Sequence, residues 1–192
     1  MTTPNQAALD FLLTRRSRPH KTLAAPAPDR DALRPLLTAA ARTPDHGKLE
    51  PWRFIVLEQD ALRRLSELAR VRGAQLGHDA DQIDKIAGMF LTAPMSIAVV
   101  ASPKASAKIP EIEQTLSAGA VSLALLNAAL AAGWGANWLT GWTAFDRPFL
   151  SQGLQLEEPE YVAGFIHIGT QTSTPPDRPR PDINAITTWV SK

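Results

Sequence analysis

Three arginines and a serine stand within four positions near the start of the chain, at Arg15, Arg16, Ser17 and Arg18. Guanidinium groups are permanently charged, forked donors that commonly bind phosphate, and the serine hydroxyl adds a neutral donor. The same residues could instead form a solvated basic group at the end of a helix, where the helix dipole favours positive charge. The residues alone leave both interpretations open.

A second group of polar side chains lies further along, in the segment RTPDHGKLEPWRF over 42–54. This segment joins a predicted helix to a predicted strand, and such irregular connections often contact ligands. Its histidine, His46, has two interpretations that remain open: a contact to a ligand, or a structural hydrogen bond after Pro44. The four histidines of the chain do not have the spacing of metal-binding motifs, so no metal site is predicted.

The composition limits which classes of chemistry are available. The chain has 192 residues, a formal net charge of +1 and no cysteine. Its balanced charge predicts neither a nucleic-acid partner nor attraction to an anionic membrane. Without cysteine there is no disulfide, thiolate nucleophile or cysteine-bound metal, so redox chemistry needs a bound cofactor. The N-terminus lacks the features of a signal peptide and no stretch has the ~20 apolar residues of a membrane span, so we expect a cytoplasmic protein.

The remaining residues predict one α+β domain over 1–192. Hydrophobic residues make up 44% of the chain, which is ordinary for a folded domain. Apolar residues at helical spacing predict helices over 6–14, 29–43, 60–76, 81–91 and 111–132. Runs of β-forming residues predict strands over 52–57, 94–101, 136–142 and 161–168. The nearly all-apolar run over 94–101 is typical of a central strand, so we expect a sheet of four or five strands between helices.

Two features indicate a homodimer. In the helix over 111–132, apolar and small residues spread around most of the circumference, and a second subunit is the simplest way to bury all of its sides. The tail over 172–192 is rich in proline and has apolar residues that need cover, namely Ile183, Ile186, Trp189 and Val190. We expect this C-terminal arm to pack on the partner subunit.

The order of these motifs resembles a known family. The blocks RRS over 15–17, RTPDH over 42–46 and PWRF over 51–54 resemble the minimal, short-chain branch of the FMN-dependent nitroreductase family. Further blocks follow in the family's order: PMSIAVV over 94–100, the alanine-rich helix from Ser117, GANWLTG over 135–141 and GFIHIGT over 164–170. The resemblance spans nearly the whole chain.

The resemblance implies an α+β fold with a nitroreductase-like central mixed sheet of four to five strands flanked by helices, assembled as an intertwined homodimer. It also implies FMN as the cofactor, bound non-covalently at two sites between the subunits. The residues implied for the FMN phosphate and ribityl chain are Arg15, Arg16 and Ser17, those approaching from the other subunit are Arg42 and His46, and those lining the ring are Trp138, Leu139 and Thr140. Further cofactor-binding candidates are Lys48, Leu49 and Arg180. The stretch linked with the nicotinamide nucleotide corresponds to Ala128, Ala129, Leu130, Ala131, Ala132 and Gly133.

The function that the resemblance implies is an NAD(P)H-dependent, nitroreductase-type oxidoreductase. Hydride would pass from NADH or NADPH through FMN to a small electron-poor acceptor, such as a nitroaromatic, a quinone or an enone, by a ping-pong mechanism. Larger members of the family carry Ser-x-x-Asn-x-Gln before Pro-Trp, whereas Asp45, Lys48 and Glu50 stand at those positions here. The chain also has little room for the insertion that covers the flavin there, so we expect an open pocket. The alternatives are a flavin storage or sensor protein without turnover, and a structural dimer without a ligand.

Overall fold

A five-stranded sheet forms the centre of the structure, a computed structural model that describes residues 3–192. The strands are β1 (Leu23–Ala24), β2 (Trp52–Leu57), β3 (Met95–Ala101), β4 (Gly135–Leu139) and β5 (Tyr161–Gln171). β3 lies between β2 and β5, and β5 also pairs with β4 and with the short β1. The predicted α+β class and the number of strands are confirmed.

The sheet is antiparallel rather than mixed, which corrects one part of the prediction. All four strand pairings among the described residues are antiparallel. β3 and β4 do run in the same direction, because the long helix between them carries the chain back along the sheet. However, β5 lies between these two strands and pairs with both of them, so they do not form a parallel pair.

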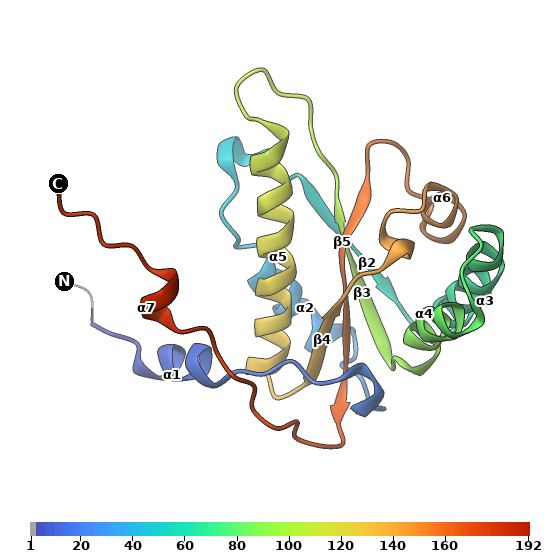
Figure 1. The fold of residues 1–192 in the computed structure, drawn as a ribbon, viewed down its shortest axis with the longest axis horizontal. Coiled ribbons are helices and arrows are strands. Elements are labelled where there is room, and N and C mark those ends of the chain that lie inside the picture. Colours follow the sequence, from blue (N-terminus) through green and yellow to red (C-terminus); the bar gives the residue numbers. More distant parts are fainter. Residues whose placement is uncertain (1–2) are drawn as a thin grey trace.

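Helices cover both faces of this sheet. They are α1 (Gln6–Thr14), α2 (Arg30–Ala40), α3 (Gln59–Gln75), α4 (Ala80–Thr92), α5 (Glu111–Ala131), α6 (Arg147–Leu154) and the short α7 (Ile183–Ile186). α2 and α5 lie on one face, and α3, α4 and α6 lie on the other (Figure 1). Each layer encloses its own hydrophobic core. All seven residues of β3 are buried between the layers, which confirms the predicted central strand.

Local signals account for most of the helix boundaries. Asp29, Asp79 and Asp146 each accept a hydrogen bond from a backbone N–H in the first turn of α2, α4 and α6, as N-cap residues do. α6 was not predicted, because its eight residues contain too few apolar positions to show a helical period. β4 ends at Leu139, short of the predicted end at 142, because Trp142–Ala144 forms a 3-10 turn instead.

α5 is the long apolar helix that the sequence predicts. By length and composition it could cross a membrane, but one side of it packs against α2 and the sheet, as the central helix of a folded domain does. Its other side exposes apolar side chains, since Ile112 and Leu116 are 62% and 65% exposed and Leu123 is 44% exposed. Within one chain, α5 is therefore buried on one side only.

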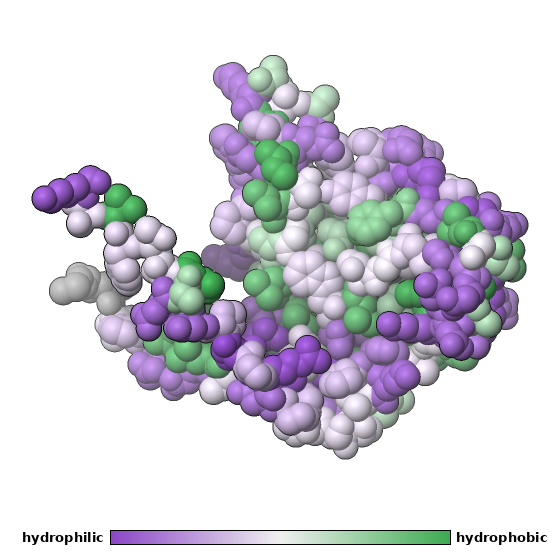
Figure 2. All heavy atoms as spheres, in the orientation of Figure 1, coloured by the Kyte–Doolittle hydropathy of each residue, from purple (hydrophilic) through white to green (hydrophobic). Residues whose placement is uncertain are grey.

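Two segments project away from the body of the molecule. α1 and the C-terminal arm, residues 172–192, extend to the same side (Figure 1). Large apolar side chains of these segments are exposed, including Leu12, Leu13, Ile186 and Trp189, and hydrophobic atoms are visible on the projecting part in Figure 2. Within the part of the chain that the structure describes, no residue of α1 or α7 is buried.

The close contact of β5 with β1 gives a stability prediction. A Cβ atom at Gly169 would lie 2.8 Å from the backbone oxygen of Ala24 and 2.7 Å from Pro94 Cγ. Because a backbone oxygen in a sheet cannot move aside easily, Gly169→Ala should lower the free energy of unfolding by about 1–3 kcal/mol. The control is Gly88→Ala in α4, where a Cβ atom meets nothing within 4 Å and helix propensity favours alanine. Denaturant unfolding measures both, and an unchanged Gly169→Ala variant would contradict the prediction.

Candidate functional site

The basic segment after α1 is held against the start of β4. The helix ends at Thr14, and Arg15 leaves the helical conformation with φ −56° and ψ 140°. The Arg18 backbone N–H donates a hydrogen bond to the Ala136 carbonyl at 2.8 Å. The Asn137 side chain in turn donates through Nδ2 to the Arg18 carbonyl at 2.6 Å. These two bonds place the segment beside β4, just after the end of α5.

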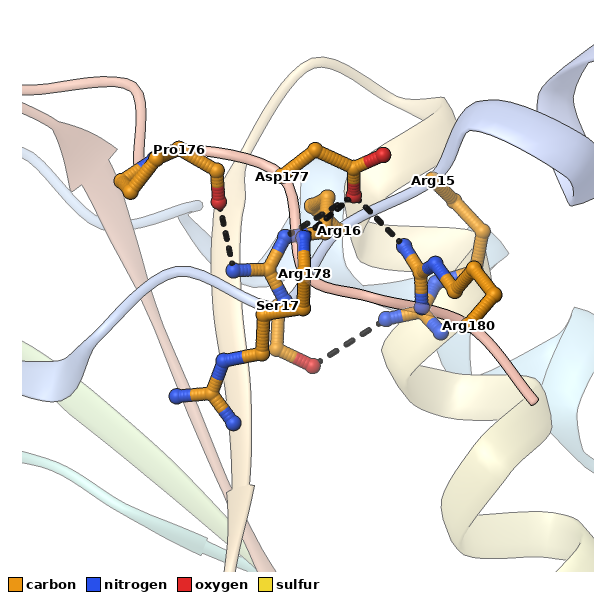
Figure 3. Close-up of polar contacts among 7 residues, drawn as sticks. All are labelled: Arg15, Arg16, Ser17, Pro176, Asp177, Arg178 and Arg180. Carbon is orange, nitrogen blue, oxygen red and sulfur yellow. Dashed lines mark hydrogen bonds and ion pairs between the residues drawn. The ribbon is translucent and has the colours of Figure 1, made fainter.

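The side chains of Arg15 and Arg16 in this segment lie beside the C-terminal arm (Figure 3). Arg15 Nη2 donates to Ser17 Oγ at 3.1 Å, and Arg16 Nη2 donates to the Pro176 carbonyl at 2.9 Å. The pKa of Arg15 is lowered, first by burial and then by the nearby charges of Arg180 and Arg16. The structure therefore brings together four of the predicted residues, Arg15, Arg16, Ser17 and Arg180, which we call the arginine cluster.

The arginine cluster contains hydrogen-bond donors that are available to bind an anion. The Nε atoms of Arg15 and Arg16 are buried and have no hydrogen-bond partner within residues 3–192. A carboxylate, Asp177, also lies there, with Oδ1 3.1 Å from Arg180 Nη2 and 3.9 Å from Arg16 Nε. A phosphate monoester offers several acceptor oxygens to such forked donors. The donor set therefore fits a phosphate group, including that of the predicted FMN.

The residues predicted to line the flavin ring lie further along β4. Trp138 packs against β5 at a point where a Cβ atom on Gly164 would lie only 2.2 Å from the indole Nε1. Glycine is therefore required for the indole to occupy this position. Leu139 is half-buried against the core under α3 and α4, and Thr140 is exposed. These three residues follow directly after Asn137, which holds the basic segment.

The second predicted group, around His46, lies at the beginning of α5. His46 Nδ1 is 2.7 Å from Glu113 Oε2, and Asp45 Oδ2 accepts a hydrogen bond from the Glu50 N–H at 2.7 Å. Asp45, His46 and Glu113 help to line an open surface pocket of about 530 Å³. The other candidates here are Arg42 and Lys48, which are exposed, and Leu49, which is half-buried. Among residues 3–192, no group of three or more His, Asp or Glu side chains could hold a metal ion.

Within one chain, the arginine cluster and the group around His46 do not meet. His46 contacts the first turn of α5, whereas the basic segment is bound to β4 after the last turn. α5 has 21 residues, and at about 1.5 Å per residue it is roughly 30 Å long. A ligand much shorter than this length therefore cannot contact both groups within one chain.

The stretch predicted for the nicotinamide nucleotide, over 128–133, covers the end of α5. Gly133 has a φ of +86°, a left-handed conformation that glycine adopts readily after a helix. Ala129 is buried, whereas Ala131 and Ala132 are exposed. The stretch offers methyl groups and backbone but no charged side chain, so its role in nucleotide binding stays a prediction.

Three residues of the site were missed by the sequence analysis. Asp177 lies within the arginine cluster, Asn137 fixes the basic segment, and Gly164 admits the Trp138 indole. The sequence could have indicated Asp177, because a carboxylate next to Arg178 and near Arg180 can pair with an arginine. The other two depend on strand register, which the sequence does not reveal.

Comparison with known proteins agrees with the resemblance seen in the sequence. Residues 12–170 match the profile of the Nitroreductase family. A protein of Escherichia coli strain K12 named "Putative NAD(P)H nitroreductase YdjA" is 35% identical over 163 residues, which cover 85% of this chain and 87% of that protein. A Haemophilus influenzae protein with the same general name is 37% identical over 165 residues, covering 85% and 88% of the two chains.

Solved structures share the fold at lower sequence identity. A nitroreductase-like family protein from Bacillus cereus superposes with a TM-score of 0.80 at 22% identity, over 99% of this chain and 98% of that one. A nitroreductase from Bacteroides fragilis with bound FMN gives a TM-score of 0.74 at 20% identity, over 98% and 100% of the two chains. These two likenesses establish the nitroreductase-like fold.

Proposed function

The chain belongs to the nitroreductase family, whose members are oxidoreductases, and on that premise we propose that it binds FMN and uses NADH or NADPH to reduce a small electron-poor acceptor. The observation that carries the proposal is the arginine cluster, in which two buried guanidinium nitrogens have no hydrogen-bond partner within the described residues. When bound, FMN would supply the hydride-transfer chemistry that links the nicotinamide nucleotide to the acceptor. The protein holds the cofactor and leaves room for each substrate in turn.

Each part of the proposed site has a separate role. Arg15, Arg16 and Arg180 would bind the phosphate through charge-assisted hydrogen bonds, and Ser17 would add a neutral donor. The β4 residues Trp138, Leu139 and Thr140 would lie against the ring. The arginine cluster and the β4 residues are fixed relative to each other, because Arg18 and Asn137 tie the basic segment to the strand. Such prior positioning reduces the entropy lost when the cofactor binds.

We propose that the functional unit is a homodimer with FMN between the subunits. The group around His46 and the arginine cluster lie at opposite ends of α5, so a second chain is needed to bring Arg42, His46, Lys48 and Leu49 to the same flavin. The exposed apolar side chains on α5, α1 and the C-terminal arm support this proposal, because association would remove them from water. We expect the C-terminal arm to pack on the partner. Light scattering measures the oligomeric state, and a monomer would contradict the proposal.

The acceptor is proposed by class only. Nitroaromatics, quinones and enones can all accept hydride. None of them requires a proton-donating side chain that is specific to that one substrate. A positive side chain from the partner, Arg42 or Lys48, would stabilise the negative charge that the ring gains on reduction. The cytoplasmic location expected from the sequence stays a prediction.

An absorbance spectrum of the purified protein, followed by anaerobic addition of NADH or NADPH, tests the proposed function. We expect a yellow protein whose flavin absorption is bleached by at least one of the nucleotides and restored by a quinone or a nitroaromatic. Flavin that binds but is not bleached would favour the storage or sensor alternative. A colourless protein that takes up no FMN on incubation would contradict the proposal.

A further inference from the structure

Asp177 lies within the arginine cluster, where the FMN phosphate is proposed to bind (Figure 3). One oxygen of its carboxylate, Oδ1, is 3.1 Å from Arg180 Nη2 and 3.9 Å from Arg16 Nε. The same oxygen accepts a hydrogen bond from the Arg178 backbone N–H at 2.8 Å. This backbone bond and the charges of Arg180 and Arg16 lower the pKa of Asp177, so its carboxylate is charged at neutral pH. The chain therefore supplies its own anion to this cluster.

We propose that Asp177 is a counter-ion that the FMN phosphate displaces, so that this residue sets how tightly the protein binds FMN and how strongly it prefers FMN to riboflavin. The inference rests on the proposed FMN site. A phosphate monoester carries close to two negative charges and three terminal oxygens, against one charge and two oxygens for the carboxylate. Two anions that share Arg16 and Arg180 repel each other, so the stronger anion replaces the weaker one.

The surroundings of Asp177 favour displacement over a permanent supporting role. Its side chain is 77% exposed, so the carboxylate can turn into solvent when a ligand arrives. Arg15 and Arg16 do not depend on it for their position, because Arg16 is held by the Pro176 carbonyl and Arg15 contacts Ser17. The Arg16 side chain is only 18% exposed, which keeps it in place after Asp177 leaves. A residue that positioned the arginines would instead be needed for tight FMN binding.

Asp177→Asn tests the inference, because it keeps the size of the side chain and removes its charge. Apoprotein of the parent and the variant would be titrated with FMN and with riboflavin, following the quenching of flavin fluorescence. We expect the variant to bind FMN about two- to fivefold more tightly, as an exposed ion pair no longer has to be broken. Riboflavin, which has no phosphate, should gain nothing. Inorganic phosphate should also raise the melting temperature of the variant more than that of the parent.

Asp182→Asn in the same arm is the matched control. Its Oδ1 accepts a hydrogen bond from the Asn184 N–H at 2.9 Å, which places it on the backbone of α7. Asp182→Asn changes the net charge by the same amount as Asp177→Asn but lies outside the arginine cluster. This control variant should therefore bind FMN as the parent does. FMN affinity that is unchanged or weaker in Asp177→Asn, or equally raised in Asp182→Asn, would overturn the inference while leaving the proposed function intact. Failure of the parent itself to bind FMN would overturn both.

Discussion

Replacing both Arg15 and Arg16 by glutamine should produce a folded protein that loses FMN during gel filtration and binds it about a hundredfold more weakly, or worse. Each guanidinium is expected to form a charge-assisted hydrogen bond with the phosphate, and such bonds contribute roughly 1.5–3 kcal/mol each. Since about 1.4 kcal/mol corresponds to a factor of ten in affinity, two lost bonds give at least this effect. Fluorescence titration of the apoprotein with FMN measures it.

Arg18→Gln is the control for this experiment, because Arg18 belongs to the same basic segment but donates to Gln171 rather than to the cluster. We expect it to retain FMN. Riboflavin affinity should change little in the Arg15→Gln, Arg16→Gln double variant, since riboflavin lacks the phosphate. Parental FMN affinity in the double variant would show that these arginines do not bind the phosphate.

The secondary structure was largely predictable because its signals are local. The apolar run over 94–101 became the fully buried β3, and the helical periods over 60–76 and 111–132 became α3 and α5. Such patterns depend on burial of neighbouring residues in the same element. The order of the strands does not, and the mixed sheet that the resemblance implies is not found, because β5 separates β3 from β4.

The candidate site was predictable in its residue types but not in its assembly. The resemblance identified Arg15, Arg16, Ser17 and Arg180, and the structure brings these four together. What joins them is a contact between residues about 160 positions apart, from Arg16 to the Pro176 carbonyl. Likewise, no local pattern could show that Gly164 would lie beneath the Trp138 indole. Long-range register and the path of the arm decide these contacts.

His167 should make the protein markedly less stable in mild acid. Its side chain on β5 is fully buried, and neither ring nitrogen has a hydrogen-bond partner among residues 3–192. Its cross-strand neighbours are Ser96 on β3 and Asn137 on β4, and the ring of His20 is centred 6.4 Å away. Burial, and secondarily the charge of His20, lowers the pKa of His167 from 6.5 to about 3.

The direction of the effect follows from which state binds the proton. Below pH 6.5 the unfolded chain protonates at this residue, whereas the native chain does so only near pH 3. The free energy of unfolding therefore falls as the pH falls through this window, by about 1.4 kcal/mol per pH unit from His167 alone. Acidification from neutrality to about pH 4.5 should remove about 3 kcal/mol of stability through this one residue.

His167→Leu removes the titrating ring and leaves an apolar side chain in a buried position. Denaturant unfolding of parent and variant across this pH range gives a difference in which the contributions of the carboxylates cancel. Between neutral pH and about pH 4.5, we expect the free energy of unfolding to fall by about 3 kcal/mol less in the variant than in the parent. His20→Gln keeps His167 and should keep most of the parental pH dependence. If the curves of the parent and His167→Leu run parallel, the folded protein accepts the proton at this position without penalty, and burial of His167 does not determine the acid sensitivity of the fold.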